Sequence, residues 1–244
     1  MGFLPLADDN RLRHRPPVVV GVLVAANLAV WIAQLTLGEA ATIGFAAVPY
    51  ELAHNIDLTG DAPTALQSVV VDGQRHAVPQ FPGPVPIYLT LLTSMFMHGS
   101  WMHVLGNMLY LWIFGDQIED LLSHGKFIAF YLLCGLFAGV AQVVMDPQSI
   151  LPCVGASGAI AGVLGAYLMK FPGNTVRVLV GIWLVPLPAI LVLGGWIALQ
   201  VVEQMNSLAG PNTGGVAYAA HIGGFVAGAL LVFLFSGQRR TSAP

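Results

Sequence analysis

A serine and a histidine in two separate apolar segments are the residues of this sequence best suited to nucleophilic catalysis. Ser157 lies in the segment GASGAIAG, and His221 lies in the segment AHIGGFVAG. A serine hydroxyl is a weak nucleophile until an adjacent base takes its proton, and imidazole suits that role near neutral pH. None of the twelve Asp and Glu residues lies deep within an apolar segment. The pattern therefore favours a Ser157–His221 dyad over a triad with a carboxylate.

Two further polar residues could supply the hydrogen-bond donors that acyl transfer requires. His103 and Asn107 are four residues apart in the segment HVLGN, so they share one face of a helix. Losing one donor to a developing oxyanion typically lowers the rate by about 10²–10³. We expect His103, Asn107 and the backbone N–H of Ser157 to stabilise the tetrahedral intermediate of such a reaction.

The composition places these residues in a membrane. The 244 residues are 56% hydrophobic and 9% charged, with a mean hydropathy of +0.76, whereas a soluble domain carries about 25% charged residues. Six uncharged stretches can each hold the roughly 20 apolar residues that cross a bilayer as a helix. We therefore predict an all-α membrane protein built as a six-transmembrane-helix bundle. The stretches are residues 16–38, 76–115, 127–145, 147–169, 178–202 and 204–238.

The positive charges indicate that both termini are cytoplasmic. Six spans put both termini on one side of the membrane, and eight of the nine Lys and Arg residues then fall on that side. Only Arg75 falls on the other side, an asymmetry typical of cytoplasmic loops. The basic stretch before the first span is followed by an apolar run too long for a signal peptide, so we expect a retained helix. The eight residues are Arg11, Arg13, Arg15, Lys126, Lys170, Arg177, Arg239 and Arg240.

The pattern predicts one membrane domain between two short tails. We expect a cytoplasmic N-terminal tail at residues 1–15, a six-span domain at 16–236 and a cytoplasmic C-terminal tail at 237–244. The long connection at 39–86 would be a structured or membrane-associated outer loop. The segment 203–215, rich in Gly, Asn and Pro, would be a mobile outer loop. Short tails and the lack of a transit peptide fit a bacterial plasma membrane.

The predicted six-span topology places the polar residues at a similar depth in the membrane. Even-numbered spans would run from outside to inside, and each of these residues lies near the start of such a span, so all should sit in the outer half of the membrane. Alone, the serine would more often be a packing residue, and the upstream histidine could be purely structural. Their shared depth in the membrane favours a catalytic role for the group as a whole. Its members are His98, His103, Asn107, Ser157 and His221.

Small residues offer the close helix approach that a dyad needs. Glycines four residues apart on the fourth and sixth spans are typical of helices that pack through backbone contact. Such packing could bring the serine hydroxyl within hydrogen-bonding range of the imidazole. We expect helix packing to be the role of five glycines, whichever function holds: Gly155, Gly158, Gly162, Gly224 and Gly228.

Three segments resemble the signature segments of the rhomboid family of intramembrane serine proteases. They are HGSWMHVLGN, GASGAIAG and AHIGGFVAG, in the family's order and spacing. The resemblance implies that Ser157 is the nucleophile and His221 the general base. It also implies that His103 and Asn107 stabilise the oxyanion and that His98 supports that region. Members cleave peptide bonds in or near transmembrane segments of other membrane proteins and need no metal, nucleotide or other cofactor.

Two features depart from the family's pattern. Ala161, four residues after Ser157, stands where some members carry an aromatic residue beside the catalytic histidine. The Trp-Arg pair found in the first loop of many members is absent from 39–86. By the same resemblance, the fifth span and the loop at 203–215 would form the moving gate and cap of the site.

Two other functions are compatible with polar groups in a helical bundle. One is a catalytically inactive rhomboid-like protein that binds or escorts membrane proteins, although such relatives tend to lose the nucleophile or the base. The other is a small transporter, which the confinement of the polar groups to one half of the membrane disfavours. His54, His76 and His124 lack metal-ligand spacing, and the net charge of −3 suggests no nucleic-acid surface. The expected partners are the lipid bilayer and transmembrane substrates, and no particular oligomeric state is predicted.

Overall fold

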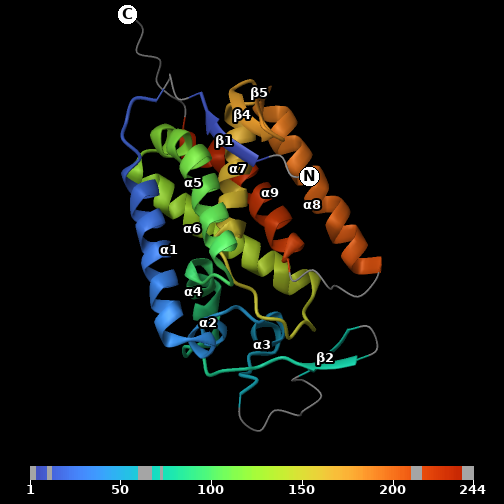
Figure 1. Cartoon of the computed structure of the whole chain (residues 1–244). Helices are drawn as coiled ribbons and strands as arrows, with labels where there is room; N and C mark the ends of the chain where they lie inside the picture. Colours follow the sequence, from blue (N-terminus) through green and yellow to red (C-terminus); the bar gives the residue numbers. More distant parts are fainter. Residues whose placement is uncertain (1–3, 10–12, 60–67, 72–73, 210–215, 238–244) are drawn as a thin grey trace, which may run out of the picture.

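The computed structural model describes residues 4–9, 13–59, 68–71, 74–209 and 216–237. Within that part of the chain, six helices of 14 residues or more form one bundle (Figure 1). Arg11, Arg239, Arg240, residues 210–215 of the expected outer loop and the expected C-terminal tail beyond residue 237 lie outside it. The six helices are α1 (Val18–Leu37), α5 (Trp101–Leu122), α6 (His124–Met145), α7 (Ser157–Lys170), α8 (Ala189–Ala209) and α9 (Tyr218–Ser236).

Four of these helices are long and apolar enough to cross a bilayer, namely α1, α6, α8 and α9. Helix α5 has 22 residues but carries Asp116, Glu119 and Asp120 near its C-terminal end. Helix α7 has 14 residues, or about 21 Å of helix, which is less than the roughly 30 Å of hydrocarbon in a bilayer. The chain is therefore a helical integral membrane protein in which α5 and α7 complete the bundle.

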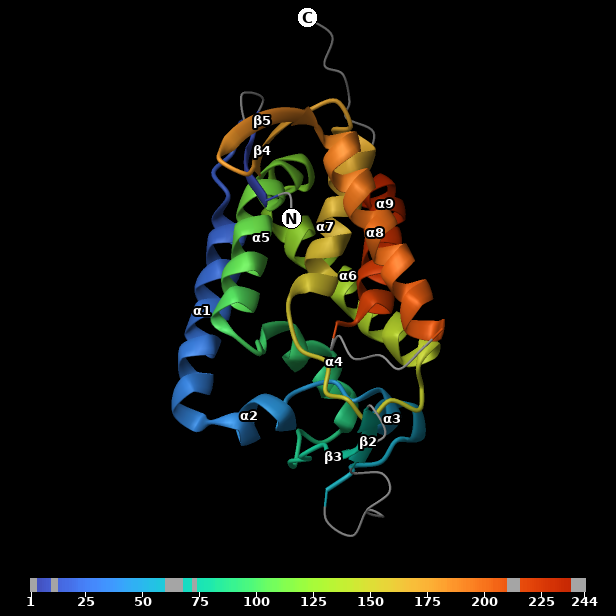
Figure 2. The same cartoon turned by 45° about the vertical axis from the view of Figure 1, so that its right-hand side comes forward.

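Helix α7 is the buried centre of the bundle. Every residue from Gly158 to Tyr167 is buried, and the helix packs against α9, α6 and α5. A helix that is apolar all round belongs in a core, where neighbouring helices replace lipid on every side. Figure 2 shows α7 enclosed by these neighbours, with α8 at the edge of the bundle. The element that begins with Ser157 is thus held on all sides by protein.

Glycines let α7 and α9 touch through their backbones. A Cβ atom built on Gly224 would overlap the carbonyl oxygen of Gly158, and one built on Gly228 would overlap that of Gly162. Close backbone approach of this kind is what small residues four positions apart allow. The structure thus places four of the five glycines at the expected helix contact. Gly155 lies in the loop before α7 and not on a helix.

A β-hairpin occupies part of the fifth uncharged stretch. Strands β4 (Thr175–Val180) and β5 (Trp183–Pro188) pair antiparallel, and Gly181 takes φ +63° in the turn between them. The fifth helix therefore begins at Ala189, eleven residues later than the stretch 178–202. Hydropathy alone does not separate these structures, because from residue 178 onward the two strands are as apolar and uncharged as a helix.

The N-terminal segment is part of the folded domain and not a free tail. Strand β1 (Leu4–Asp8) pairs with β4, which gives a three-stranded antiparallel sheet in the order β1-β4-β5 at one end of the bundle. Asp8 Oδ2 accepts hydrogen bonds from Tyr167 Oη at 2.6 Å and from Gln117 Nε2 at 2.8 Å. Burial raises the pKa of the Asp8 carboxyl, and these two donors act against that rise. Within the tail predicted at 1–15, residues 4–8 are therefore a strand of the folded domain.

The described part of the first long loop forms short helices and strands and lies at the opposite end of the bundle (Figures 1 and 2). An isolated β-bridge between Ala47 and Cys153 joins it to the segment that leads into α7. Val48, Leu58, Val78 and Ile150 form a small apolar core beneath it. The elements of this region are α2 (Glu39–Gly44), α3 (Pro49–His54), β2 (Ser68–Val71), β3 (Gln74–Ala77), η2 (Ile87–Leu89), α4 (Thr90–Thr93) and η3 (Ser94–Phe96).

The second uncharged stretch does not form one continuous helix. The chain passes through η2, α4 and η3 before α5 begins at Trp101. Ser100 caps α5, since its side chain accepts a hydrogen bond from the backbone N–H of His103. The expectation that His98 belongs to the second span is therefore wrong, because this residue lies in the short loop that precedes the cap.

Candidate active site

The predicted reactive residues lie at the N-terminal ends of three helices. Ser157 is the first residue of α7, His221 is the fourth residue of α9, and His103 is the third residue of α5, with Asn107 one turn further on. All three helix ends face the first-loop end of the bundle, away from the β1-β4-β5 sheet (Figure 2). The structure thus brings these residues to the same end of the bundle.

Ser157 and His221 meet across the contact between α7 and α9. His221 Nε2 lies 2.8 Å from Ser157 Oγ, and both residues are partly buried. The backbone contact of Gly224 on Gly158 lies next to this pair and sets the short distance between the two helices. The backbone N–H of Ser157 belongs to the first turn of α7, where amides have no partner within the helix. A nucleophile, a base and a backbone donor of the first helical turn therefore lie together.

Asn107 is held by His98, which is itself held by the first helix. Asn107 Nδ2 lies 3.0 Å from His98 Nε2, and His98 Nδ1 lies 3.2 Å from the carbonyl oxygen of Phe96. The carbonyl can only accept, so His98 carries its proton on Nδ1 and accepts from the Asn107 amide on Nε2. Gln34 of α1 bonds to both the backbone N–H and the carbonyl of His98, at 3.1 and 2.9 Å. This chain of contacts fixes the Asn107 amide beside the dyad.

His103 lies between His98 and the loop before α7. The rings of His98 and His103 meet edge to face, with centroids 5.1 Å apart. A Cβ atom on Gly155 would lie 2.7 Å from His103 Nε2, and Gly155 takes φ +125°, a conformation that other residues rarely adopt. Glycine at this position therefore lets the chain pass close to the His103 ring just before Ser157.

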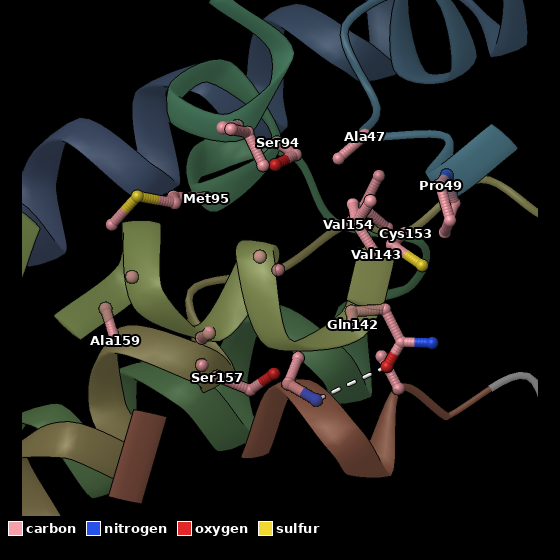
Figure 3. A pocket seen from close by; sticks show the side chains of 18 of the residues that line it. Ala47, Pro49, Ser94, Met95, Gln142, Val143, Cys153, Val154, Ser157 and Ala159 are labelled. Carbon is pink, nitrogen blue, oxygen red and sulfur yellow. Dashed lines mark hydrogen bonds between the residues drawn. The ribbon is translucent and has the colours of Figure 1, made fainter. Parts of the chain in front are cut away.

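Ser157 lines two cavities. The larger, of about 620 Å³, lies between α5, α7, α8 and α9, and its lining includes Ser157, His221, His103 and Asn107. The smaller, of about 50 Å³, is also lined by Ser157, which Figure 3 labels among its lining residues. There Gln142 Oε1 accepts a hydrogen bond of 3.3 Å from the backbone N–H of Ala220. The smaller cavity is large enough to hold a water molecule.

Three residues of the site were not predicted from the sequence. Gln34 holds His98, Gln200 Oε1 lies 2.7 Å from His221 Nδ1, and the Trp196 ring lies 5.8 Å from the His221 ring. Gln34 and Gln200 are amides inside mainly apolar spans, and such residues are a signal that the sequence does carry. Within the described residues, no group of three or more His, Cys, Asp or Glu side chains is arranged to hold a metal ion.

Comparison with known proteins identifies the family of this chain. The Rhomboid domain family matches residues 87–238, which is more than half of the chain and includes α5 to α9. The matched segment therefore contains Ser157, His221, His103, Asn107 and His98.

Individual relatives cover smaller parts of the chain. Rhomboid protein 1, mitochondrial, of Saccharomyces cerevisiae is 29% identical over 147 residues, which is 58% of this chain and 40% of that protein. Rhomboid-like protein 11, chloroplastic, of Arabidopsis thaliana is 29% identical over 162 residues, 62% of this chain and 54% of that protein. Rhomboid protease GluP of Bacillus subtilis is 40% identical over 78 residues, 32% of this chain and 15% of that protein. The chain thus spans about half or less of the length of these relatives. By the extent of the domain match, it belongs to the rhomboid family.

Proposed function

We propose that this protein is an intramembrane serine endopeptidase that cleaves transmembrane segments of other membrane proteins near the outer membrane interface. The observation that carries the proposal is the distance of 2.8 Å between His221 Nε2 and Ser157 Oγ. Ser157 Oγ attacks the scissile carbonyl carbon while its proton passes to His221 Nε2. The tetrahedral intermediate then collapses, the C–N bond breaks, and His221 returns the proton to the leaving amine. Water attacks the resulting ester by the same route and restores Ser157.

The dyad acts without a carboxylate. Among the described residues, the hydrogen-bond partners of the His221 ring are Ser157 and Gln200. An ionised carboxylate at this depth would be costly because little water is present to solvate it. These two contacts support the proposal of a dyad as the catalytic unit.

The developing oxyanion has three candidate donors. They are the Asn107 amide, the His103 ring and the backbone N–H of Ser157, and all lie beside the larger cavity. Asn107 is buried and held by His98, so its donor is already oriented before the substrate binds. His98 acts through this contact as a supporting residue.

The variant Asn107→Ala is expected to lower kcat by about 10²–10³, because it removes one preorganised oxyanion donor. KM should change by less than about threefold, since the donor acts mainly on the transition state. Initial rates over a range of reporter concentrations measure both constants. Asn27→Ala serves as the matched control, because that buried amide bonds to Leu23 within α1 and lies outside the site. Equal kcat in Asn107→Ala and wild type would remove Asn107 from the mechanism.

We further propose six spans with both termini in the cytoplasm of a bacterium. The β1-β4-β5 sheet would lie at the cytoplasmic end, and the dyad and first loop in and above the outer half of the membrane. In support, Arg177 lies in β4 of the sheet, and Arg13 pairs with Asp116 near the C-terminal end of α5. The relatives are named mitochondrial and chloroplastic as well as bacterial, so the bacterial plasma membrane rests on the sequence prediction. The domain would begin at β1 instead of residue 16 and end with α9.

Substrates of this site would be single-span proteins whose helix unwinds near the outer interface. An intact helix shields its carbonyl groups within its own hydrogen bonds, so an attacking hydroxyl needs a locally extended segment. The larger cavity is open enough for such a segment beside Ser157. Helix α8 flanks this cavity and would serve as the gate. The expected cap at 203–215 is helical as far as Ala209, and its remainder lies outside the described residues.

The function is tested with purified protein in liposomes and two reporters of equal length. One carries a transmembrane segment with a central Gly-Pro pair, and the other carries an unbroken polyleucine helix. The first reporter should be cut within or next to its transmembrane segment with no metal or nucleotide added, and the second should remain intact. Failure of folded wild-type protein to cut the first reporter would contradict the protease and favour the binding or escort alternative.

A further inference from the structure

His221 has a second hydrogen-bond partner whose chemistry bears on the base. Gln200 Oε1 lies 2.7 Å from His221 Nδ1, on the side of the ring opposite to Ser157. A neutral imidazole carries one proton, on either Nδ1 or Nε2. With Oε1 as the neighbour, Nδ1 donates, and Nε2 is left with the lone pair that faces Ser157 Oγ. This is the tautomer that a general base requires.

Gln200 is a buried polar side chain on a helix at the edge of the bundle. Helix α8 lies at the edge of the bundle (Figures 1 and 2) and exposes most of its apolar residues. Among its described side chains, those that are buried are Ala189, Leu193 and Gln200. An amide without a partner at this depth is unfavourable by a few kcal/mol. The hydrogen bond that satisfies Gln200 is the one to His221.

Trp196 lies one turn before Gln200 on the same face of α8. Its ring lies 5.8 Å from the His221 ring at 38° and 6.2 Å from the Phe225 ring at 32°. Ala161 lines the cavity that Trp196 and His221 also line. The aromatic ring beside His221 is thus that of Trp196, and position 161 carries no ring. The face of α8 thus contacts the His221 ring and bonds its Nδ1.

We propose that Gln200 is a positioning residue that holds His221 in the tautomer and orientation needed to accept the Ser157 proton, with Trp196 packed beside the ring. This inference rests on the proposed protease function. Gln200 takes the place that a carboxylate has in a Ser-His-Asp triad. A neutral amide is less costly to bury at membrane depth than a carboxylate, and it orients the imidazole with the same acceptor geometry. Helix α8 therefore supplies part of the catalytic arrangement as well as a wall of the cavity.

Two substitutions at position 200 separate orientation from packing. Gln200→Leu removes the acceptor at nearly the same volume and is expected to lower kcat by about 10² with KM changed by less than about threefold. Gln200→Glu keeps an acceptor and is expected to restore kcat to within about tenfold of wild type. It should also shift the low-pH limb of the kcat/KM profile to higher pH, because the carboxylate stabilises the imidazolium. Asn27→Leu, which likewise replaces a buried amide by an apolar side chain but lies in α1 outside the site, is the control and should leave kcat unchanged.

If Gln200 had only a structural role, the two variants would differ from wild type in another way. In that case Gln200→Leu would lower thermal stability without lowering kcat, or Gln200→Glu would be as slow as Gln200→Leu with an unshifted pH profile. Either result would overturn the proposal. Both variants are compared with wild type by thermal unfolding in detergent, so that only folded protein enters the kinetic comparison.

The tautomer itself is measured independently of cleavage. Nitrogen-15 NMR of histidine-labelled protein, with the His221 signals assigned by their loss in His221→Ala, should show the proton on Nδ1 in wild type and a mixture of tautomers in Gln200→Leu. A proton on Nε2 in wild type would overturn the proposal even if the protein cleaves its reporter. Failure to cleave with the proton on Nδ1 would instead contradict the protease and leave the contact intact.

Discussion

The variants Ser157→Ala, His221→Ala and the double variant are each expected to lower the cleavage rate by about the same factor, on the order of 10⁶. Ser157 Oγ and His221 Nε2 are 2.8 Å apart and act as one unit, since the hydroxyl attacks only when the imidazole takes its proton. Once either residue is removed, the other has nothing left to contribute. The effects of the two substitutions are therefore not additive.

The measurement is the single-turnover rate of the liposome assay for all four proteins. His54→Ala is the matched control, because this exposed histidine bonds to the carbonyl of Tyr50 in the first loop. Its rate should stay within about twofold of wild type, as is usual for surface changes away from a site. A double variant slower than both single variants by the product of their factors would mean that the two residues act separately and would contradict the dyad.

Gly228→Leu is expected to abolish the folded bundle. A Cβ at this position would overlap the carbonyl group and the Cα of Gly162, which are backbone atoms and cannot move aside as a flexible side chain can. The substitution would separate α7 from α9 and take His221 away from Ser157. Overpacking in a well-packed core costs about 1–3 kcal/mol and occasionally more, and we expect a loss above about 4 kcal/mol here because backbone meets backbone.

Size-exclusion chromatography and thermal unfolding in detergent measure this effect. Gly21→Leu is the matched control, since a Cβ on Gly21 in α1 meets no atom within 4 Å. That variant should elute and unfold like wild type. A folded Gly228→Leu protein with an unchanged unfolding temperature would show that α7 and α9 are not held together by backbone contact.

The membrane character and the family follow from the sequence, because both depend on local patterns. Long uncharged stretches determine α1 and α6 closely, and the prediction of a rhomboid-family protein is confirmed by the domain match. The placement of Ser157 beside His221 was also expected from paired glycines at matched depth. Whether this pair is catalytic stays a prediction.

The elements that differed depend on contacts between distant segments. Strand β1 forms because β4 offers a free edge, and the charge count of residues 1–15 contains no sign of that pairing. The hairpin of β4 and β5 is hidden in the stretch 178–202, since strands and helices of apolar residues have the same hydropathy. His98 lies before α5 because the cap at Ser100 sets where the helix begins.

Within the site, too, the surroundings of Ala161 depend on a contact between distant segments. From the sequence alone, an alanine four residues after Ser157 leaves the packing of His221 without its expected aromatic neighbour. In the structure that neighbour is Trp196, which comes from a different helix and is 35 residues away in the chain. Only the packing of α8 against α9 shows that Trp196 takes the place of the aromatic residue expected four positions after Ser157.

Labelling by a fluorophosphonate probe tests the central claim most directly, because the probe forms a covalent bond only with an activated serine. Folded wild-type protein in detergent is treated with the probe, digested and mapped by mass spectrometry. The adduct is expected on Ser157, and it should be absent in His221→Ala protein that remains folded. Folded wild-type protein without an adduct on Ser157, or labelled equally in His221→Ala, would contradict the account of Ser157 as a nucleophile activated by His221.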